Sequence, residues 1–393
     1  MTKPLKIVYC TPALYLAGGM ERVMTLKANY FAEHNHDDVT IIITDGKGKE
    51  PFYELSDKVK VINLDINFEE LWNQPFLKKV LLYLKKQREY KKKLTECLLQ
   101  LHPDITVSML RREINFLTSI PDGSKKIGEI HINRAHFRTF EGRESNFVKS
   151  CFSKYWMHIL LKSLKRLDKF VALTERDKEA WTELNNVEVI PNPLSLKPVA
   201  YSSCANKRII AIGRYSHEKG YDHLLQAWAS IQDRFQDWRL DVYGDGERSS
   251  YERIIDQLHI DRNRCCLNPA TKEVEKVLAE SSIAVCSSRF EGFGLAIIEA
   301  MACGLPVVSF DCPWGPRSII QDGEDGFLVE NGNVTLLSEA IAKLISDYDL
   351  RVKMGANARV NVQRFSIEAI GQQWRKLFEE LTINSTSADE SDR

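Results

Sequence analysis

The 393-residue chain has 54 Lys and Arg against 54 Asp and Glu, so its formal net charge is zero and no global attraction to nucleic acid is expected. Its 44% hydrophobic and 27% charged residues are typical of a globular protein, and its length suggests two domains with separate cores. No apolar run reaches the ~18–20 residues that cross a bilayer. The nine cysteines are scattered without a Cys-x-x-Cys pair, and no signal-peptide pattern is present, so we expect a reduced, cytoplasmic protein.

Short β-branched runs alternate with longer amphipathic stretches along the chain. We expect strands in the first half at 6–10, 39–44, 59–64, 105–109, 126–131, 170–174 and 187–191, and in the second half at 208–213, 239–244, 282–288, 306–310 and 326–330. Continuous apolar strands separated by helices predict parallel sheets with helices on both faces. Because this rhythm starts twice, we predict an α/β protein with two doubly wound, Rossmann-like domains.

The domain boundary is expected at Pro191-Asn192-Pro193, because two prolines end a strand and stiffen a turn. The first domain would then span 1–190 and the second 194–366. The chain past Ser346 reads as helical to about Leu381, and the polar tail at 382–393 is expected to be disordered.

Two loops of the first domain follow strand ends, where open α/β sheets bind ligands. Gly18 and Gly19 precede a helix, so a ligand could closely approach its N-terminus; a flexible turn is an equal alternative. In GEIHINRAHF, His131 clusters with Arg134 and His136 at the end of a strand. A lone histidine is usually structural, but this position makes His131 a candidate site residue.

The second domain has two comparable loops. Arg214 and Lys219 lie five residues apart in IGRYSHEKG, just before a helix, and together could bind a diphosphate. An isolated pair of this kind is usually a solvated surface; its place after a strand favours function. Gly244 begins the Gly-Asp-Gly of VYGDGERSS, which imitates a dinucleotide fingerprint weakly and is better read as a loop bordering a cleft.

The stretch SSRFEGFGLAIIEAMACGLPVVSFD (287–311) places Glu291 and Glu299 around a Gly-Phe-Gly loop. A helix expected to begin near Leu295 would offer its free N–H groups to an anion. Alone, Glu299 would read as an exposed helix residue. Beside Glu291, it predicts a ligand that has hydroxyls as well as phosphates. The candidate substrate-binding residues here are Glu299 and the loop residues Phe293, Gly294 and Leu295, with Glu291 as a catalytic candidate.

Taken in order along most of the chain, these motifs resemble the retaining nucleotide-sugar glycosyltransferases of family 4, which have the GT-B architecture. The resemblance rests on GGMERV, GEIHINRAH, VIPNP, IGRYSHEKG, YGDGE, the Glu-x7-Glu of SSRFEGFGLAIIEAMACGLPVV, and DGFLV. It implies two Rossmann-like domains facing a cleft, with a C-terminal helix at about 367–381 crossing back to the first domain, anchored by Trp374 and Phe378.

The resemblance also implies roles for single residues. Arg214 and Lys219 would hold the donor diphosphate, Glu291 would contact the transferred sugar, and Glu299 the ribose. His131 would lie beside the reacting anomeric carbon. The donor would be a UDP-sugar, with a GDP-sugar as the alternative, and the acceptor a glycan or lipid-linked molecule of bacterial surface polysaccharide or glycolipid synthesis.

No cofactor and no metal are expected, because cations and a helix end can stabilise the charge on the leaving phosphate. The Asp-x-Asp at 347–349 lies in a helical region, away from every strand end. Two other enzyme classes fit less well: a phosphorylase would be larger, and an epimerase needs no acceptor face. A catalytically inactive subunit that binds sugars or acts as a scaffold in polysaccharide assembly is the alternative from another class.

Two basic stretches contain apolar side chains. Between Lys78 and Lys93 there are eight Lys and Arg and one acid, interleaved with Leu81, Leu82, Tyr83, Leu84 and Tyr90; Lys149–Lys169 carries Phe152, Tyr155, Trp156, Ile159 and Leu160. Solvated helices are the usual interpretation. We hypothesise instead that the first domain rests peripherally on the anionic inner face of the cell membrane.

Overall fold

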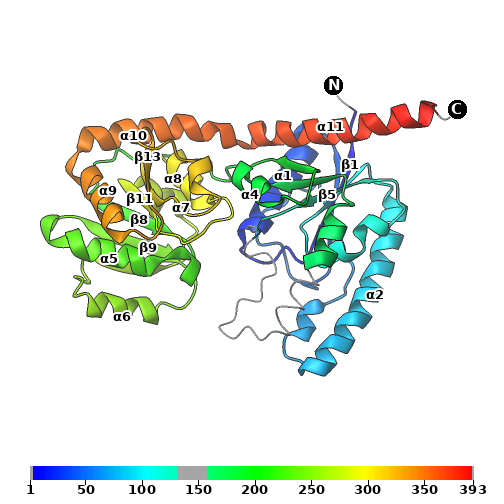
Figure 1. The fold of residues 1–393 in the computed structure, drawn as a ribbon, viewed down its shortest axis with the longest axis horizontal. Coiled ribbons are helices and arrows are strands. Elements are labelled where there is room, and N and C mark those ends of the chain that lie inside the picture. The colour runs from blue at the N-terminus through cyan, green and yellow to red at the C-terminus, as the bar shows by residue number, and fades with distance from the viewer. Residues whose placement is uncertain (1–2, 132–133, 135–156, 392–393) are drawn as a thin grey trace. The chain divides into compact units, whose positions relative to one another are not determined.

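The computed structural model describes residues 3–131, 134 and 157–391. The chain divides into two compact units. Unit 1 comprises Met1–Pro193 together with Ile370–Arg393, and unit 2 comprises Leu194–Ala369 (Figure 1). Each unit is an α/β domain built on a parallel sheet, which confirms the predicted fold class.

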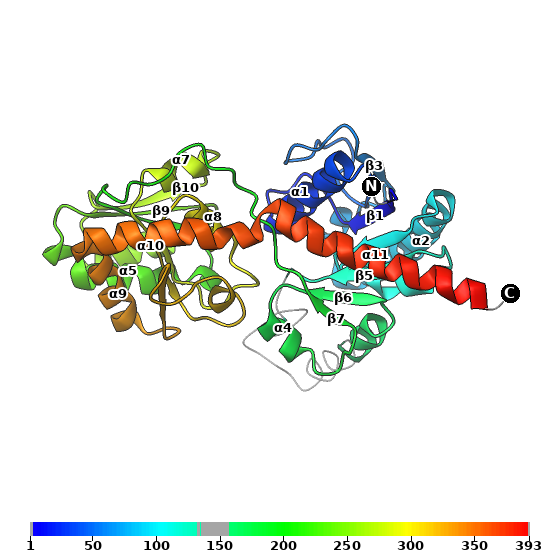
Figure 2. The same ribbon diagram turned by 90° about the horizontal axis from the view of Figure 1, so that it is seen from above.

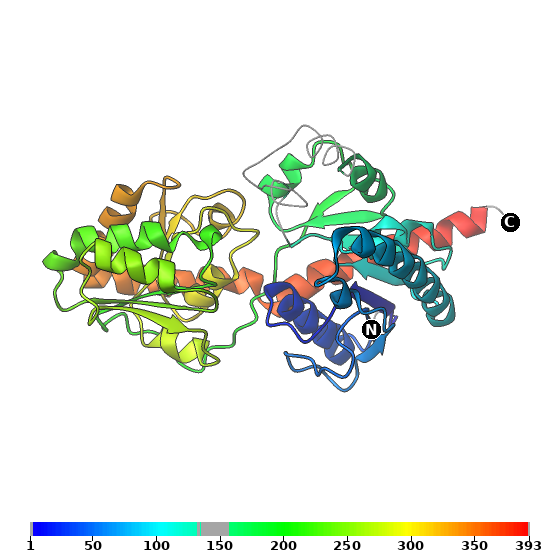
Figure 3. The same ribbon diagram turned by 90° about the horizontal axis from the view of Figure 1, so that it is seen from below.

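The sheet of unit 1 has seven strands in the order β3-β2-β1-β4-β5-β6-β7. All its neighbouring strands pair in parallel; their bounds are β1 Lys6–Thr11, β2 Asp38–Ile43, β3 Lys60–Asn63, β4 Ile105–Ser108, β5 Lys125–Glu129, β6 Lys169–Ala172 and β7 Val187–Val189. The helices of this unit include α1 (Gly19–His34), α2 (Phe76–Leu101) and α4 (Glu175–Ala180), and α11 (Ile367–Ser391) belongs to it from Ile370 on; Figures 2 and 3 show them from two further directions.

Helices cover both faces of the unit 1 sheet, and side chains along β1 point alternately to one face and the other. Val8 and Cys10 pack in one cluster with Tyr90 and Leu94 of α2. Tyr9, between them in sequence, is fully buried and lies beneath the ammonium group of Lys27 on α1. The continuous apolar pattern of β1 therefore reflects a strand buried between two helical layers.

Unit 2 repeats the arrangement with six strands in the order β10-β9-β8-β11-β12-β13. The strands are β8 Arg208–Ile212, β9 Arg239–Gly244, β10 Cys265–Pro269, β11 Ile283–Cys286, β12 Val307–Phe310 and β13 Gly326–Val329. Its helices are α5 Tyr221–Ile231, α6 Ser249–Gln257, α7 Val274–Ala279, α8 Leu295–Ala302, α9 Val334–Ser346 and α10 Tyr348–Asn361. In each sheet the strand order reverses beside the unit's first strand, the position at which doubly wound sheets bind ligands.

The twelve expected strands all form, with small differences at their ends. A thirteenth, β10, was missed because its sequence, Cys-Cys-Leu-Asn-Pro, lacks β-branched residues. It lies at the edge of the sheet, pairing with β9, where a proline is tolerated. Helix α11 extends beyond the expected end at Leu381, to Ser391.

Helix α11 packs against unit 1, as the predicted crossing of the C-terminal helix requires. Both expected anchors are buried: Trp374 is 1% exposed and Phe378 is fully buried, with its ring 5.4 Å from that of Phe31 on α1. Arg375 donates to Asp37 at 2.6 Å and to the backbone carbonyl of Lys3 at 2.6 Å. Buried apolar contacts and a buried ion pair therefore hold the helix in place.

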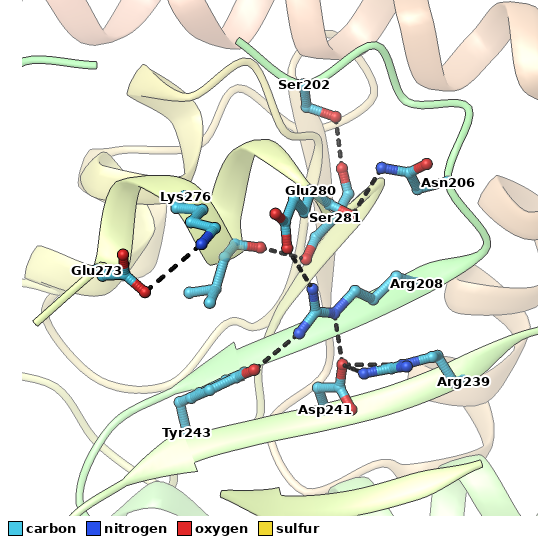
Figure 4. Close-up of polar contacts among 11 residues, drawn as sticks. Ser202, Asn206, Arg208, Arg239, Asp241, Tyr243, Glu273, Lys276, Glu280 and Ser281 are labelled. Atoms are coloured by element: carbon cyan, nitrogen blue, oxygen red, sulfur yellow. Dashed lines mark hydrogen bonds and ion pairs between the residues drawn. The ribbon is translucent and has the colours of Figure 1, made fainter. Parts of the chain in front are cut away.

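A polar network fixes the amino-terminal side of the unit 2 sheet (Figure 4). Arg208 of β8 and Arg239 of β9 both donate to Oδ2 of the buried Asp241, the latter at 2.6 Å. Arg208 also contacts the hydroxyl of Tyr243 at 2.8 Å and the carboxylate of Glu280 at 3.1 Å. The shared carboxylate offsets the repulsion between two arginines on adjacent strands. We therefore assign this network a role in stabilising the sheet.

Candidate functional site

The charged centre of unit 2 lies beyond the carboxyl ends of β8 and β11. Lys219 ends the short 3-10 helix η5 (His217–Lys219), and its Nζ donates to Oε1 of Glu291 at 2.7 Å. The hydroxyl of Ser288 donates to the same oxygen at 2.6 Å. Two of the sequence candidates, Lys219 and Glu291, are therefore brought together from segments 72 residues apart.

The electrostatics of this pair keep Lys219 charged at neutral pH. Burial by itself would lower the pKa of Lys219, but the neighbouring Glu291 and the Cys286 side chain outweigh it and raise that pKa. Lys219 and Glu291 keep 22% and 13% of their side-chain surfaces exposed. The pair is thus partly accessible and could exchange contacts with a bound ligand.

Close backbone packing joins the loops that carry the pair. Gly220 has φ +59°, and a Cβ there would lie 2.2 Å from the carbonyl oxygen of Ser287. Arg289 stabilises the same junction, because its guanidinium group donates two hydrogen bonds to the carboxylate of Asp222, at 2.9 and 2.6 Å. A larger residue at position 220 would force the Lys219 and Glu291 loops apart.

The glycine candidate Gly244 also has a packing explanation. A Cβ at Gly244 would lie 1.9 Å from the carbonyl oxygen of Gly213, so the loops after β8 and β9 touch through this residue. Arg214, which follows Gly213, is exposed. Its guanidinium group is therefore presented to solvent beside the loop that carries Lys219.

Helix α8 begins where the sequence predicts an anion-binding helix end. Gly294 is its N-cap with φ +112°, and the N–H of Ile297 bonds back to the carbonyl of Gly294 at 2.9 Å. The N–H groups of Leu295 and Ala296 precede this first helical bond. Phe293, the preceding candidate, is buried with its ring 5.4 Å from that of Phe365, so its side chain serves packing.

Glu299 is placed differently from Glu291. It is 4% exposed on α8 and accepts a hydrogen bond from Ser195 at 3.2 Å. Glu299 therefore differs from an ordinary solvated helix glutamate, and its carboxylate contacts the segment that follows the domain boundary. Glu291, in contrast, contacts Lys219 and Ser288.

In unit 1, His131 follows β5 and forms part of a buried charge cluster. Its Nε2 lies 3.4 Å from Oε1 of Glu129, whose carboxylate oxygens each lie 2.5 Å from Nζ of Lys27. Burial opposes ionisation of Glu129, but Lys27 and His131 outweigh it and bring its pKa to about 2. Glu129 is therefore a carboxylate at neutral pH and contacts the His131 ring in that form.

Arg134, Gly18 and Gly19 do not join this cluster. Arg134 pairs with Glu183 at 2.5 Å, so it serves the region near α4, and His136 lies outside the described residues. Gly18 is the N-cap of α1 and Gly19 its first residue, with the chain extended at Gly18. Helix α1 therefore begins at the second of the paired glycines, one residue earlier than the sequence suggested.

Sequence reasoning missed Lys27, Glu129, Ser195 and Ser288. Glu129 was detectable, because it lies two residues before His131 within the strand expected at 126–131, a spacing that places two side chains on the same face. Lys27 gave no signal, since it reads as a solvated lysine in the middle of α1 although it is completely buried. Its partner lies 102 residues away.

Two classes of feature are not found in the described part of the chain. No group of three or more His, Cys, Asp or Glu side chains there is arranged to hold a metal ion. None of the helices described is both long and apolar enough to span a membrane.

Part of unit 2 matches a known family model. Residues 204–361 match the family model described as "Glycosyl transferases group 1". An uncharacterized glycosyltransferase of Haemophilus influenzae is 29% identical over 365 residues, which cover 91% of this chain and 96% of the relative. The matched domain, this relative and the two-sheet fold support a GT-B glycosyltransferase.

Two further proteins are similar to this chain over nearly its whole length. The amylovoran biosynthesis glycosyltransferase AmsD of Erwinia amylovora is 24% identical, with 95% of this chain and 99% of AmsD covered. A mutant of S. aureus TarM, solved in complex with fondaparinux, alpha-GlcNAc-glycerol and UDP, shares the fold with a TM-score of 0.74 and 17% identity. That match covers 95% of this chain and 99% of TarM.

Proposed function

We propose that this protein transfers a hexose from a nucleotide-diphosphate sugar to a glycan or lipid-linked acceptor with retention of anomeric configuration. The observation that carries the proposal is the Lys219–Glu291 pair beside the N-terminus of α8, at the carboxyl edge of the unit 2 sheet. A UDP-sugar is the favoured donor, with a GDP-sugar as the alternative. The UDP bound by TarM, which has the same fold, supports this choice.

Each proposed role follows from where charge develops. Breaking the bond between sugar and diphosphate places negative charge on the departing phosphate, and preorganised cations and N–H dipoles stabilise that charge. Lys219, Arg214 and the first N–H groups of α8 would act there. Glu291 would accept hydrogen bonds from hydroxyls of the transferred sugar, with Lys219 and Ser288 holding its carboxylate in place.

The remaining roles concern the ribose and the anomeric carbon. Glu299 is proposed to accept hydrogen bonds from the ribose, after exchanging its contact with Ser195. His131 is proposed to lie beside the anomeric carbon. The buried Glu129 and Lys27 would fix the orientation of its ring. Because Lys27 and Glu129 are almost completely buried, they would act through His131 and would not touch the sugar.

For the biological setting, we propose synthesis of a bacterial surface polysaccharide or glycolipid at the inner face of the cell membrane. The relationship to AmsD, a protein of amylovoran biosynthesis, supports a polysaccharide product. A lipid-linked acceptor would be reached most directly by a protein that rests peripherally on the membrane.

The test of the proposed function is transfer of labelled sugar by the purified protein. UDP- and GDP-hexoses would be supplied with candidate acceptors, and the anomeric configuration of the product determined by NMR. Retention of the donor's configuration is expected. Nucleotide binding with neither hydrolysis nor transfer would favour the inactive sugar-binding subunit, and an inverted product would contradict the retaining assignment.

A second prediction concerns divalent metal ions. Because Lys219, Arg214 and the α8 end are proposed to neutralise the diphosphate, EDTA should leave the transfer rate largely unchanged. The initial rate is measured with EDTA and after adding back magnesium or manganese. A loss of more than about tenfold, restored by either metal, would show that a metal ion provides the stabilisation assigned here to side chains.

A further inference from the structure

Helix α2 carries large apolar side chains that unit 1 does not cover. Leu77 is 77% exposed, Leu81 70%, Leu84 49% and Val80 42%. Their spacing of i, i+3, i+4 and i+7 aligns them in one stripe along the helix. Trp72, which precedes the helix, adds a 67% exposed indole. This set, Trp72 with the four α2 residues, is called the α2 stripe below.

The stripe is distinct from the face of α2 that packs on the sheet. That face is formed mainly by Tyr90, Leu94 and Leu98, each at most 1% exposed and clustered with residues of β1. Tyr90 belongs to the basic stretch of the sequence, and the structure assigns it to the core. The exposed apolar residues of the stripe lie in and just before the first turns of α2. Figure 1 shows that this helix runs along the outside of unit 1.

Positive charge continues the same face of the helix. Arg88, Lys91 and Lys92 follow Leu84 at i+4, i+7 and i+8 and are exposed. Exposed Lys78, Lys79 and Lys85 flank the stripe. Lys86 and Lys93 of the same helix instead reach backbone carbonyls of Ile66 and Leu64, at 2.5 and 2.9 Å, and so help to attach the helix to unit 1.

We infer that the α2 stripe and its lysines and arginines form a docking surface for an anionic lipid bilayer. An apolar stripe bordered by basic residues is the pattern of helices that lie in the membrane interface. The apolar side chains would enter the acyl boundary, while the cations contact anionic headgroups. Docking through α2 would place the transfer reaction at the membrane surface, and this part of the inference rests on the proposed function.

Charge decides between a bilayer and a second copy of the chain. Between Lys78 and Lys93 there are eight Lys and Arg against one acid, so a symmetric dimer through this face would oppose like charges. An anionic bilayer complements both the apolar stripe, through its acyl chains, and the basic side chains, through its headgroups. Of the second basic stretch, Leu160 is buried and residues 149–156 lie outside the described residues, so the inference rests on α2 alone.

The experiment is vesicle flotation of the full-length protein without nucleotide sugar. Vesicles of phosphatidylcholine alone are compared with vesicles that also contain phosphatidylglycerol, at low and high salt. We expect binding to the anionic vesicles at low salt and weaker binding at high salt. The double variant Leu77→Ser/Leu81→Ser should reduce binding by roughly tenfold or more, because its two side chains supply much of the inserted apolar surface.

Val360→Ser is the matched control, since Val360 is 73% exposed on a helix of unit 2. It should bind vesicles like the parent. Thermal unfolding checks that all the variants are folded. Because the substituted side chains are exposed, we expect the variants to fold like the parent. Absence of binding to anionic vesicles at low salt, or equal binding by the double variant, would overturn the inference. So would a dimer that the double variant dissociates.

The outcome is separable from that of the transfer reaction. Because no nucleotide sugar is present in the flotation assay, an inactive protein could still bind vesicles through α2. If the inference is correct, the double variant should keep its rate with a soluble acceptor while losing vesicle binding.

Discussion

Replacing Glu291 by Gln should lower kcat by about ten- to a hundredfold while leaving the KM for the donor nearly unchanged. The proposed contact is to hydroxyls of the transferred sugar, whose ring gains positive charge as the bond breaks. A carboxylate would therefore bind the transition state more tightly than the ground state. A hydrogen bond to a charged group contributes roughly 1.5–3 kcal/mol, which sets the expected range. Steady-state kinetics over a range of donor concentrations separates the two parameters.

Glu299→Gln is the matched comparison on the same loop–helix segment. The ribose does not change during reaction, so loss of this contact should raise the donor KM and weaken binding of free nucleotide, with kcat little affected. Because Glu299 is buried and contacts Ser195, the thermal unfolding of the Glu299→Gln variant should be measured together with its kinetics. If Glu299→Gln binds free nucleotide as tightly as the parent while Glu291→Gln does not, the two assignments are reversed.

Replacing Arg375 by Met should destabilise unit 1 by roughly 3–5 kcal/mol at neutral pH, because it leaves the buried Asp37 carboxylate without its cation. Arg375 joins α11 to Asp37 at 2.6 Å, and both side chains are at most 9% exposed. Burial raises the pKa of Asp37 even with Arg375 present, so Asp37 should take up a proton readily in the variant. The destabilisation should therefore shrink as the pH is lowered. Urea unfolding at several pH values measures it.

Lys376→Met is the control for this change. Lys376 is the next residue of α11, 79% exposed, and pairs with Glu380 at 3.9 Å. Exposed pairs of this kind contribute little, so its loss should cost less than about 1 kcal/mol. Equal effects of the two substitutions would indicate that helix propensity, rather than the contact with Asp37, stabilises α11 on unit 1.

The sequence predicted most of the fold because its patterns are local. A strand buried on both faces is continuously apolar, and a doubly wound sheet requires helices between such strands, so twelve strands could be located from residue order. The Pro191-Asn192-Pro193 boundary and the start of α8 after Gly294 are likewise set by backbone preferences of single residues. β10 lacked these signals, because pairing with β9 rather than its own composition makes it a strand.

The sequence also placed Lys219 and Glu291 on strand-end loops, but their contact was decided by tertiary structure. Two loops 72 residues apart meet there because Gly220 lets them touch. The pairing of Lys27 with Glu129 could not be read in advance, since a buried lysine and a solvated one look the same in a helix. Local periodicity identifies the residues that share a face, as in α2, where it could not distinguish buried Tyr90 from exposed Leu81. Which face is covered, and which charge finds a partner, depends on elements distant in the chain.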